Sequence, residues 1–138
     1  MIVLDTNVVS ALMHPIPDTK VFDWLNTQPR TSVWTTSITV FEVSFGLRIM
    51  AEGRRRTALI EEFAGVLRDL GQRILMFDTD AAQRTAELMA TRQRQGNARD
   101  LRDTMIAGIV SSHRASLATR NIAHFEDAGV PLINPWDA

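Results

Sequence analysis

Short apolar segments alternate along the chain with longer segments whose apolar residues recur at helical spacing. The short runs predict buried strands at residues 1–4, 32–35, 73–77, 116–119 and 131–134. The longer segments predict helices over residues 6–13, 19–28, 38–50, 54–70, 79–95 and 100–114, with a further helical turn within 122–127. This alternation is typical of an α/β domain whose mainly parallel sheet is covered by helices on both faces.

Capping and breaking residues support these boundaries. Asp18, Ser37 and Asp78 each precede a predicted helix, and their side-chain oxygens can accept hydrogen bonds from its first free N–H groups. Gly71 is expected to end the helix before it. The segment HPIPD, with its two prolines, is expected to close the first helix.

The composition is that of one globular domain. With 138 residues, the chain is expected to form a single domain over residues 1–138, and chains of about this size bury roughly 70% of their unfolded surface. The absence of cysteine excludes disulfides and thiolate metal sites and fits a cytoplasmic location. No apolar run approaches the roughly 18 residues of a membrane span, and no signal peptide is recognisable, so we expect no membrane association.

The charge is nearly balanced but unusual in kind. The formal net charge is −1, and of 15 basic residues only Lys20 is a lysine. The planar guanidinium of arginine suits phosphate binding, but high arginine content can also follow from genomic base composition, and both explanations stay open. Because the chain has neither a net positive charge nor a helix-turn-helix pattern, we expect no DNA binding by this chain alone.

Two polar residues are predicted to lie at the same edge of the sheet. Asp5 directly follows the first strand, and Asn121 comes just after the fourth. Parallel sheets bind ligands beyond the carboxyl ends of their strands. Asp5 is therefore either the N-cap of the next helix or a metal ligand. Thr6 or Asn7 can supply the same cap, so capping does not by itself require Asp5.

Two further acids occupy otherwise apolar helical faces. Glu42 is the only acid within 37–50, and Asp103 lies one turn after the predicted N-cap Asp100. The apolar residues that share the face of Glu42 are Ile38, Phe45 and Ile49. Since an unpaired buried charge is costly, Glu42 has either an arginine partner or a cation to bind. For Asp103, the alternative to a cation is interaction with the positive end of the helix dipole.

Together these acids indicate more than each does alone. Asp5, Glu42 and Asp103 are predicted to converge at one sheet edge, where they would repel one another and raise each other's pKa values unless a cation is bound. Mg²⁺ is typically held by a few carboxylates and keeps several of its waters. Such a site is typical of metal-assisted phosphodiester hydrolysis.

Four segments closely resemble the motifs of the PIN-domain family. They are IVLDTNVVS with Asp5, SITVFEVSFG with Glu42, DLRDTMIAGIV with Asp103, and LATRNIAHFEDAGVPLINPW. The most similar branch is that of the VapC-type toxins of toxin–antitoxin pairs, including the FitB-like subgroup that ends in NPW. The resemblance runs from Met1 to Trp136, nearly the whole chain.

The resemblance implies a PIN-like three-layer α/β/α sandwich and a Mg²⁺- or Mn²⁺-dependent ribonuclease that cuts RNA, often a tRNA or rRNA. It also implies a homodimer neutralised by a VapB- or FitA-like antitoxin, with DNA reached only through that antitoxin. The dimer interface and the antitoxin groove are expected on helices 38–50 and 54–70, which carry more apolar positions than one sheet face requires. Those positions are Phe41, Phe45, Ile49, Leu59, Phe63 and Leu67.

Individual residues receive roles by matching position in the family motifs. The metal-binding and catalytic acids are Asp5, Glu42 and Asp103. The residues expected to shape the substrate side are Thr6 and Asn7 in the first loop and Thr119 at the site edge.

Four arginines are expected to form a track for RNA phosphates near these acids. Arg99 and Arg102 flank the start of the helix that carries Asp103, and Arg92 and Arg94 extend the track. The alternative is ordinary solvated surface.

The chain departs from the family pattern near its end. After the TR segment the family has Asp or Asn and then commonly Asp before Phe, and here these places hold Asn121 and His124. Asn121 is a further catalytic candidate because its amide oxygen can bind a metal or a water, but it carries no charge. His124 is either solvated or orders water or phosphate. The sequence therefore supports one metal site better than two.

Two alternatives stand beside the nuclease. A degenerate PIN domain would bind RNA or a partner without cleavage. Haloacid-dehalogenase-like phosphatases and response-regulator receivers also use an aspartate at the end of an early strand, but they need a later lysine. Lys20 is the only lysine and comes too early in the chain. We therefore favour the metal-dependent ribonuclease.

Overall fold

A parallel sheet lies at the centre of the computed structural model, which describes residues 1–16 and 18–138. Pro17, the second proline of the HPIPD segment, lies outside the described residues. The strands are β1 (Ile2–Leu4), β2 (Val33–Thr36), β3 (Ile74–Leu75), β4 (Ser116–Ala118) and β5 (Leu132–Ile133). Their order across the sheet is β3-β2-β1-β4-β5, and every neighbouring pair is parallel.

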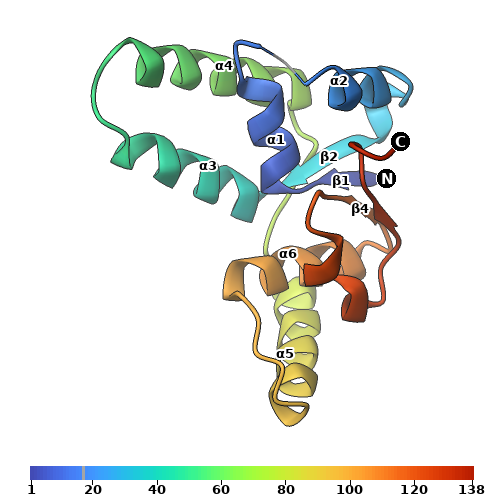
Figure 1. The fold of residues 1–138 in the computed structure, drawn as a ribbon. Coiled ribbons are helices and arrows are strands. Elements are labelled where there is room, and N and C mark those ends of the chain that lie inside the picture. The colour runs from blue at the N-terminus through green and yellow to red at the C-terminus, as the bar shows by residue number, and fades with distance from the viewer. Residues whose placement is uncertain (17) are drawn as a thin grey trace.

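Helices cover the sheet on both sides (Figure 1). One group is α1 (Thr6–Met13), α2 (Thr19–Asn26), α3 (Ser37–Ile49) and α4 (Arg54–Leu70), and α5 (Thr79–Arg94) and α6 (Leu101–Ser112) form the opposite layer. Helices α3 and α4 run out together past the sheet (Figure 1). Within the described residues, no helix combines the length and apolar character needed to cross a bilayer.

Two apolar cores, one on each face of the sheet, hold these layers together. In β1, Leu4 packs in the core under α1 and α4, whereas Val3 packs in the core with α5 and α6. In β4, Ala118 and Leu117 divide in the same way, because successive side chains of a strand point to opposite faces. The predicted three-layer α/β/α sandwich is therefore confirmed.

The predicted element boundaries agree closely with the observed ones. Helices 6–13 and 54–70 match α1 and α4 at both ends, and the predicted strand 73–77 is shorter, with only Ile74–Leu75 paired. The turn predicted within 122–127 consists of two 3-10 segments, Ile122–His124 and Glu126–Ala128. A further 3-10 segment, Arg30–Ser32, was not predicted.

One predicted helix cap is wrong. Asp18 and Asp78 cap α2 and α5 as expected, but α3 is capped by Thr36, whose hydroxyl accepts from the Thr39 N–H at 3.1 Å. Strand β2 continues through Thr36, so Ser37 is already helical. The Ser37 hydroxyl instead accepts from the backbone N–H of Phe77 at 3.2 Å.

Candidate active site

Asp5 is both a helix cap and the buried centre of a polar cluster. It is 3% exposed, and its Oδ1 accepts from the Thr6 N–H at 2.8 Å. Its Oδ2 accepts from the Thr119 hydroxyl at 2.7 Å and from the Asn7 amide at 3.4 Å. The cap interpretation is therefore correct, but it uses one carboxylate oxygen, and the other faces the segment that follows β4.

The surroundings of Asp5 oppose its ionisation. Burial raises the pKa of this carboxyl to about 6, hydrogen bonds from Thr119 and Thr6 partly offset that rise, and the charges of Asp103 and Glu42 add to it. A nearby cation would favour the charged form instead. The charged form of Asp5 is therefore less stable in this site than it would be in water.

Glu42 lies beside the same loop on α3. Its Oε1 accepts from the Thr6 hydroxyl at 3.0 Å, and its Oε2 lies 3.8 Å from Nε of Arg102. Burial raises the pKa of Glu42, while Thr6 and Arg102 lower it. An arginine partner for Glu42 was one of the two explanations offered by the sequence, and it is present.

The face assigned to Glu42 is not uniformly buried. Ile38 is buried, but Phe45 and Ile49 are exposed, so the prediction of one apolar stripe was wrong there. The buried residues of α3 are Ile38, Thr39, Val43 and Leu47. Helix α3 runs past the sheet (Figure 1), and in its later turns Phe45 and Ile49 are exposed while Leu47 stays buried.

Asp103 is paired with a histidine. His124 Nδ1 lies 3.1 Å from Asp103 Oδ2, and the imidazole is about half exposed. Asp100 caps α6 as predicted, with its Oδ1 accepting from the N–H groups of Arg102 and Asp103. His124, which stands in place of a family acid, therefore contacts one of the candidate acids instead of being simply solvated.

The three acids are neighbours but are not assembled around a common point. The charges of Asp103 and Glu42 both act on Asp5, and that of Asp103 acts on Glu42. Even so, no three Asp, Glu or His side chains in residues 1–16 and 18–138 lie close enough to hold one ion together. The oxygen donors suit Mg²⁺ or Mn²⁺ in kind. The side chains of Glu42 and Asp103 are partly exposed.

Asn121 lies at the same sheet edge as Asp5. Its backbone N–H donates to the Thr119 hydroxyl at 3.0 Å, and this hydroxyl in turn donates to Asp5. The Asn121 side chain is exposed and has no hydrogen bond to any described residue. Its position thus agrees with the sequence, while its catalytic role stays a prediction.

The predicted arginine track is only partly on the surface. Arg102 lies between Glu42 and Asp100, at 3.8 Å from each carboxylate. Arg99 is exposed and donates to the Ala123 carbonyl at 3.2 Å. Both remain candidates for phosphate contacts at the mouth of the site.

Arg92 was wrongly placed in that track, because it is 2% exposed. Its guanidinium donates to both carboxylate oxygens of Asp127, at 2.8 and 2.7 Å, and holds the pKa of Asp127 below its usual range. It also donates to the Thr104 hydroxyl at 2.9 Å and the His124 carbonyl at 3.1 Å. Arg92 therefore joins the helix of Asp103 to the loop of His124.

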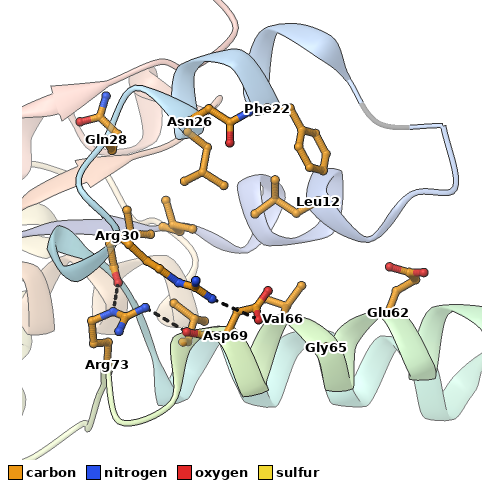
Figure 2. Close-up of a pocket in the computed structure, with 14 residues that line it drawn as sticks. Leu12, Phe22, Asn26, Gln28, Arg30, Glu62, Gly65, Val66, Asp69 and Arg73 are labelled. Atoms are coloured by element: carbon orange, nitrogen blue, oxygen red, sulfur yellow. Dashed lines mark hydrogen bonds and ion pairs between the residues drawn. The ribbon is translucent and has the colours of Figure 1, made fainter.

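A separate cleft lies between α2 and α4 (Figure 2). It has a volume of about 620 Å³ and an apolar floor that includes Leu12, Leu25 and Val66. At its rim Arg30 pairs with Asp69 at 3.4 Å, and Figure 2 shows this pair above α4. None of the candidate acids lines this cleft.

The raised pKa of Asp5 predicts a particular pH dependence of stability. The folded state holds this proton more tightly than the unfolded chain, so wild-type stability falls as pH rises from about 4 to about 6. In metal-free buffer, the free energy of unfolding of Asp5→Asn relative to wild type should increase by about 2–3 kcal/mol across this window. Urea denaturation at several pH values measures it, and a pH-independent difference would contradict the assignment.

Comparison with known proteins gives consistent matches. Residues 2–130 match the sequence profile of the PIN domain. The chain is 41% identical to VapC ribonuclease Y4jK of Sinorhizobium fredii, over 99% of each chain. It is 31% identical to the tRNA(fMet)-specific endonuclease VapC of Salmonella typhimurium, over 73% of each chain.

Solved structures match over nearly the same length. The crystal structure of FitAcB from Neisseria gonorrhoeae has a TM-score of 0.91 at 32% identity, with full coverage of both chains. The structure of FitAB bound to an IR36 DNA fragment has a TM-score of 0.89 at 32% identity, covering 99% of this chain and 96% of that one.

Proposed function

Because this chain belongs to the PIN-domain family, in its branch of VapC- and FitB-type toxins, we propose that it is a metal-dependent endoribonuclease and the toxin of a toxin–antitoxin pair. The observation that carries the proposal is that Asp5, Glu42 and Asp103 lie close enough at the carboxyl edge of the sheet for their charges to act on one another. One relative is named a VapC ribonuclease and another a tRNA(fMet)-specific endonuclease, and these names support RNA as the substrate class. A cytoplasmic location remains a prediction.

The three acids are the groups that would hold a divalent cation, Mg²⁺ or Mn²⁺. When bound there, the cation would neutralise charge on the phosphate and favour deprotonation of the attacking water. Thr119 and Thr6 orient the carboxylates of Asp5 and Glu42 by donating hydroxyl hydrogens to them. The raised pKa values of these two acids are consistent with a site that gains stability when a cation is bound.

Substrate phosphates would approach through the arginines at the start of α6. The contact between Arg102 and Glu42 is long, at 3.8 Å, and Arg102 is partly exposed. Its guanidinium can therefore turn from Glu42 to a phosphate oxygen without breaking a close ion pair. Arg99 lies three residues earlier and is exposed, so its guanidinium is a second candidate for a phosphate contact.

Induced expression tests the function directly. Expression of the wild-type chain should arrest growth and produce new RNA 5′ ends at a small number of sites, and Asp103→Asn should produce neither. Growth arrest without new RNA ends would favour the alternative, a degenerate domain that binds RNA or a partner without cleavage.

We propose that the antitoxin binds in the cleft between α2 and α4, which includes α4 but not α3 of the two helices expected from the sequence. The cleft combines an apolar floor with charged residues at its rim, which suits an amphipathic partner segment. Related solved structures are described as FitAB and VapBC assemblies, including FitAB bound to an IR36 DNA fragment and DNA-bound VapBC from Salmonella typhimurium. This supports a VapB- or FitA-like partner, to which we assign the DNA contact. Co-expression with a VapB- or FitA-like antitoxin that binds this chain should abolish RNA cleavage.

Helices α3 and α4 supply the surface for a proposed homodimer. Of the apolar positions singled out in the sequence, Phe63 is buried and Leu59 and Leu67 are partly buried, so these three belong to the core. The exposed ones are Phe41, Phe45 and Ile49 on α3, with Ile60 nearby in sequence on α4. Phe41 and Phe45 stack with ring centroids 6.2 Å apart. An exposed apolar patch of this kind marks an interface.

The dimer prediction is tested by charge insertion. Phe45→Glu combined with Ile49→Glu should convert the wild-type dimer into a monomer in light scattering. Met89→Glu, at another exposed apolar position on α5, is the matched control and should remain dimeric. If the wild-type chain is a monomer at high concentration, the dimer prediction is wrong.

A further inference from the structure

A second cavity, of about 710 Å³, opens beside the candidate active site, and the residues of interest in its lining are Asn7, His14, Asp18, Arg120 and Trp136. Asn7 is shared with the acid cluster, since its amide donates to Asp5 Oδ2 and to the Thr119 hydroxyl, each at 3.4 Å. The side-chain oxygen of Asn7, Oδ1, accepts from the backbone N–H of Arg120 at 3.2 Å. One side chain thus connects the buried acid to the wall of the cavity.

The Arg120 guanidinium is held against an aromatic ring. Its central carbon lies 4.8 Å from the centroid of the Trp136 ring, a distance typical of a cation–π contact. Trp136 is fixed in turn, because its indole N–H donates to Asp18 Oδ2 at 2.9 Å. The arginine and the ring therefore stack on one wall of the cavity.

The charge of Arg120 remains available to a ligand. Both oxygens of Asp18 are engaged, one by Trp136 and the other by the backbone N–H of Lys20 at 3.0 Å. Across residues 1–16 and 18–138, the Arg120 side chain forms no ion pair with a carboxylate. The cavity thus presents a planar cation that forms no ion pair, and the carboxylate of Asp18 in the same lining is held by Trp136 and the Lys20 backbone instead.

We propose that this cavity binds one nucleotide of the RNA, adjacent to the phosphate that is cut; this inference rests on the proposed nuclease function. A guanidinium plane can stack on a base and also attract its phosphate. His14 supplies hydrogen-bonding groups in the same cavity. The cavity would therefore contribute base preference, which the carboxylates and phosphate contacts of the active site do not provide.

Binding of single-stranded RNA to the full chain tests this assignment. Fluorescence anisotropy with four labelled hexaribonucleotides, one for each base, is measured in EDTA so that metal-dependent cleavage does not occur. Arg120→Ala should weaken binding of the preferred RNA about 10-fold and reduce the difference among the four bases. Arg120→Lys keeps the charge but loses the planar fork, so it should also lose base preference while keeping more of the affinity.

Controls separate this proposal from the function on which it rests. Arg84→Ala, at an exposed arginine of α5, should bind like wild type, and Trp136→Phe keeps an aromatic ring and serves if the alanine variant does not fold. Unchanged affinity and base preference in Arg120→Ala would overturn the subsite, as would weakened antitoxin binding with RNA binding intact. Cleavage of the same RNAs by wild type with Mn²⁺ is measured in parallel, so loss of the subsite with cleavage retained leaves the nuclease function in place.

Discussion

Glu42→Gln and Asp103→Asn are each expected to lower metal-dependent RNA cleavage by roughly 100- to 1,000-fold, because each removes a charge from the group that would hold the cation and polarise the phosphate. Asp5→Asn should act in the same way, since Asp5 is the buried member of the cluster. Cleavage of a labelled RNA at saturating Mn²⁺ by purified variants measures the effect.

The fold should survive these substitutions, because an amide keeps the size of the carboxylate and one of its two acceptor oxygens. Circular dichroism and thermal unfolding check this for each variant. Glu87→Gln, at an exposed acid of α5, is the matched control and should cleave like wild type. Wild-type activity in both Glu42→Gln and Asp103→Asn would mean that the site lies elsewhere.

Arg92→Ala is expected to cause the largest loss of stability among the arginine variants. Removing one partner of a buried ion pair costs about 3–5 kcal/mol, and because Asp127 is 30% exposed and regains some solvation, we expect roughly 2–4 kcal/mol here. The Thr104 hydroxyl and the His124 carbonyl also lose their donor. Urea denaturation gives the change in the free energy of unfolding.

Arg94→Ala provides the comparison for that experiment. Arg94 is exposed, and its side chain reaches only the Thr91 hydroxyl, at 3.4 Å, among the described residues. Its replacement should change stability by less than about 0.5 kcal/mol. Equal effects of the two substitutions would contradict the role given to Arg92.

Local sequence patterns were sufficient to predict most of the helices and strands and their arrangement. Helix caps and the spacing of apolar residues depend on neighbours a few positions away, so Asp18, Asp78 and Asp100 could be placed correctly. The position of the candidate site at the carboxyl edge of the sheet was predicted from the parallel arrangement of the strands. Asp5 and the segment after β4 do lie together at that edge. In the register of β1 and β4, Leu4 is opposite Ala118, which places Asp5 beside Thr119.

The sequence contained a pattern that could have shown that Arg92 is buried and does not belong to the phosphate track. Ala81, Thr85 and Arg92 are the buried residues of α5, and Leu88 is packed beside the core between them. Positions 81, 85, 88 and 92 form one helical stripe. An arginine on a buried stripe needs an acid partner, but Asp127 is 35 positions away in sequence, so the partner could not be identified from local pattern.

Other features depended on contacts that no local pattern specifies. The pairing of His124 with Asp103 requires the turn after β4 to fold back onto α6. The cavity at Arg120 and Trp136 joins residues from both ends of the chain, since Trp136 is 118 positions from Asp18. The exposure of Phe45 and Ile49 depends on how far α3 extends past the sheet, which apolar spacing does not determine.

A metal titration of RNA cleavage tests the central claim most directly. Purified wild-type chain is treated with EDTA, incubated with a labelled RNA, and supplied with increasing Mg²⁺ or Mn²⁺. We predict no cleavage in EDTA, saturable restoration by either ion, and no restoration in Asp103→Asn at the same concentrations. Cleavage that persists in EDTA, or that the ions restore equally in wild type and Asp103→Asn, would contradict a metal site built from Asp5, Glu42 and Asp103.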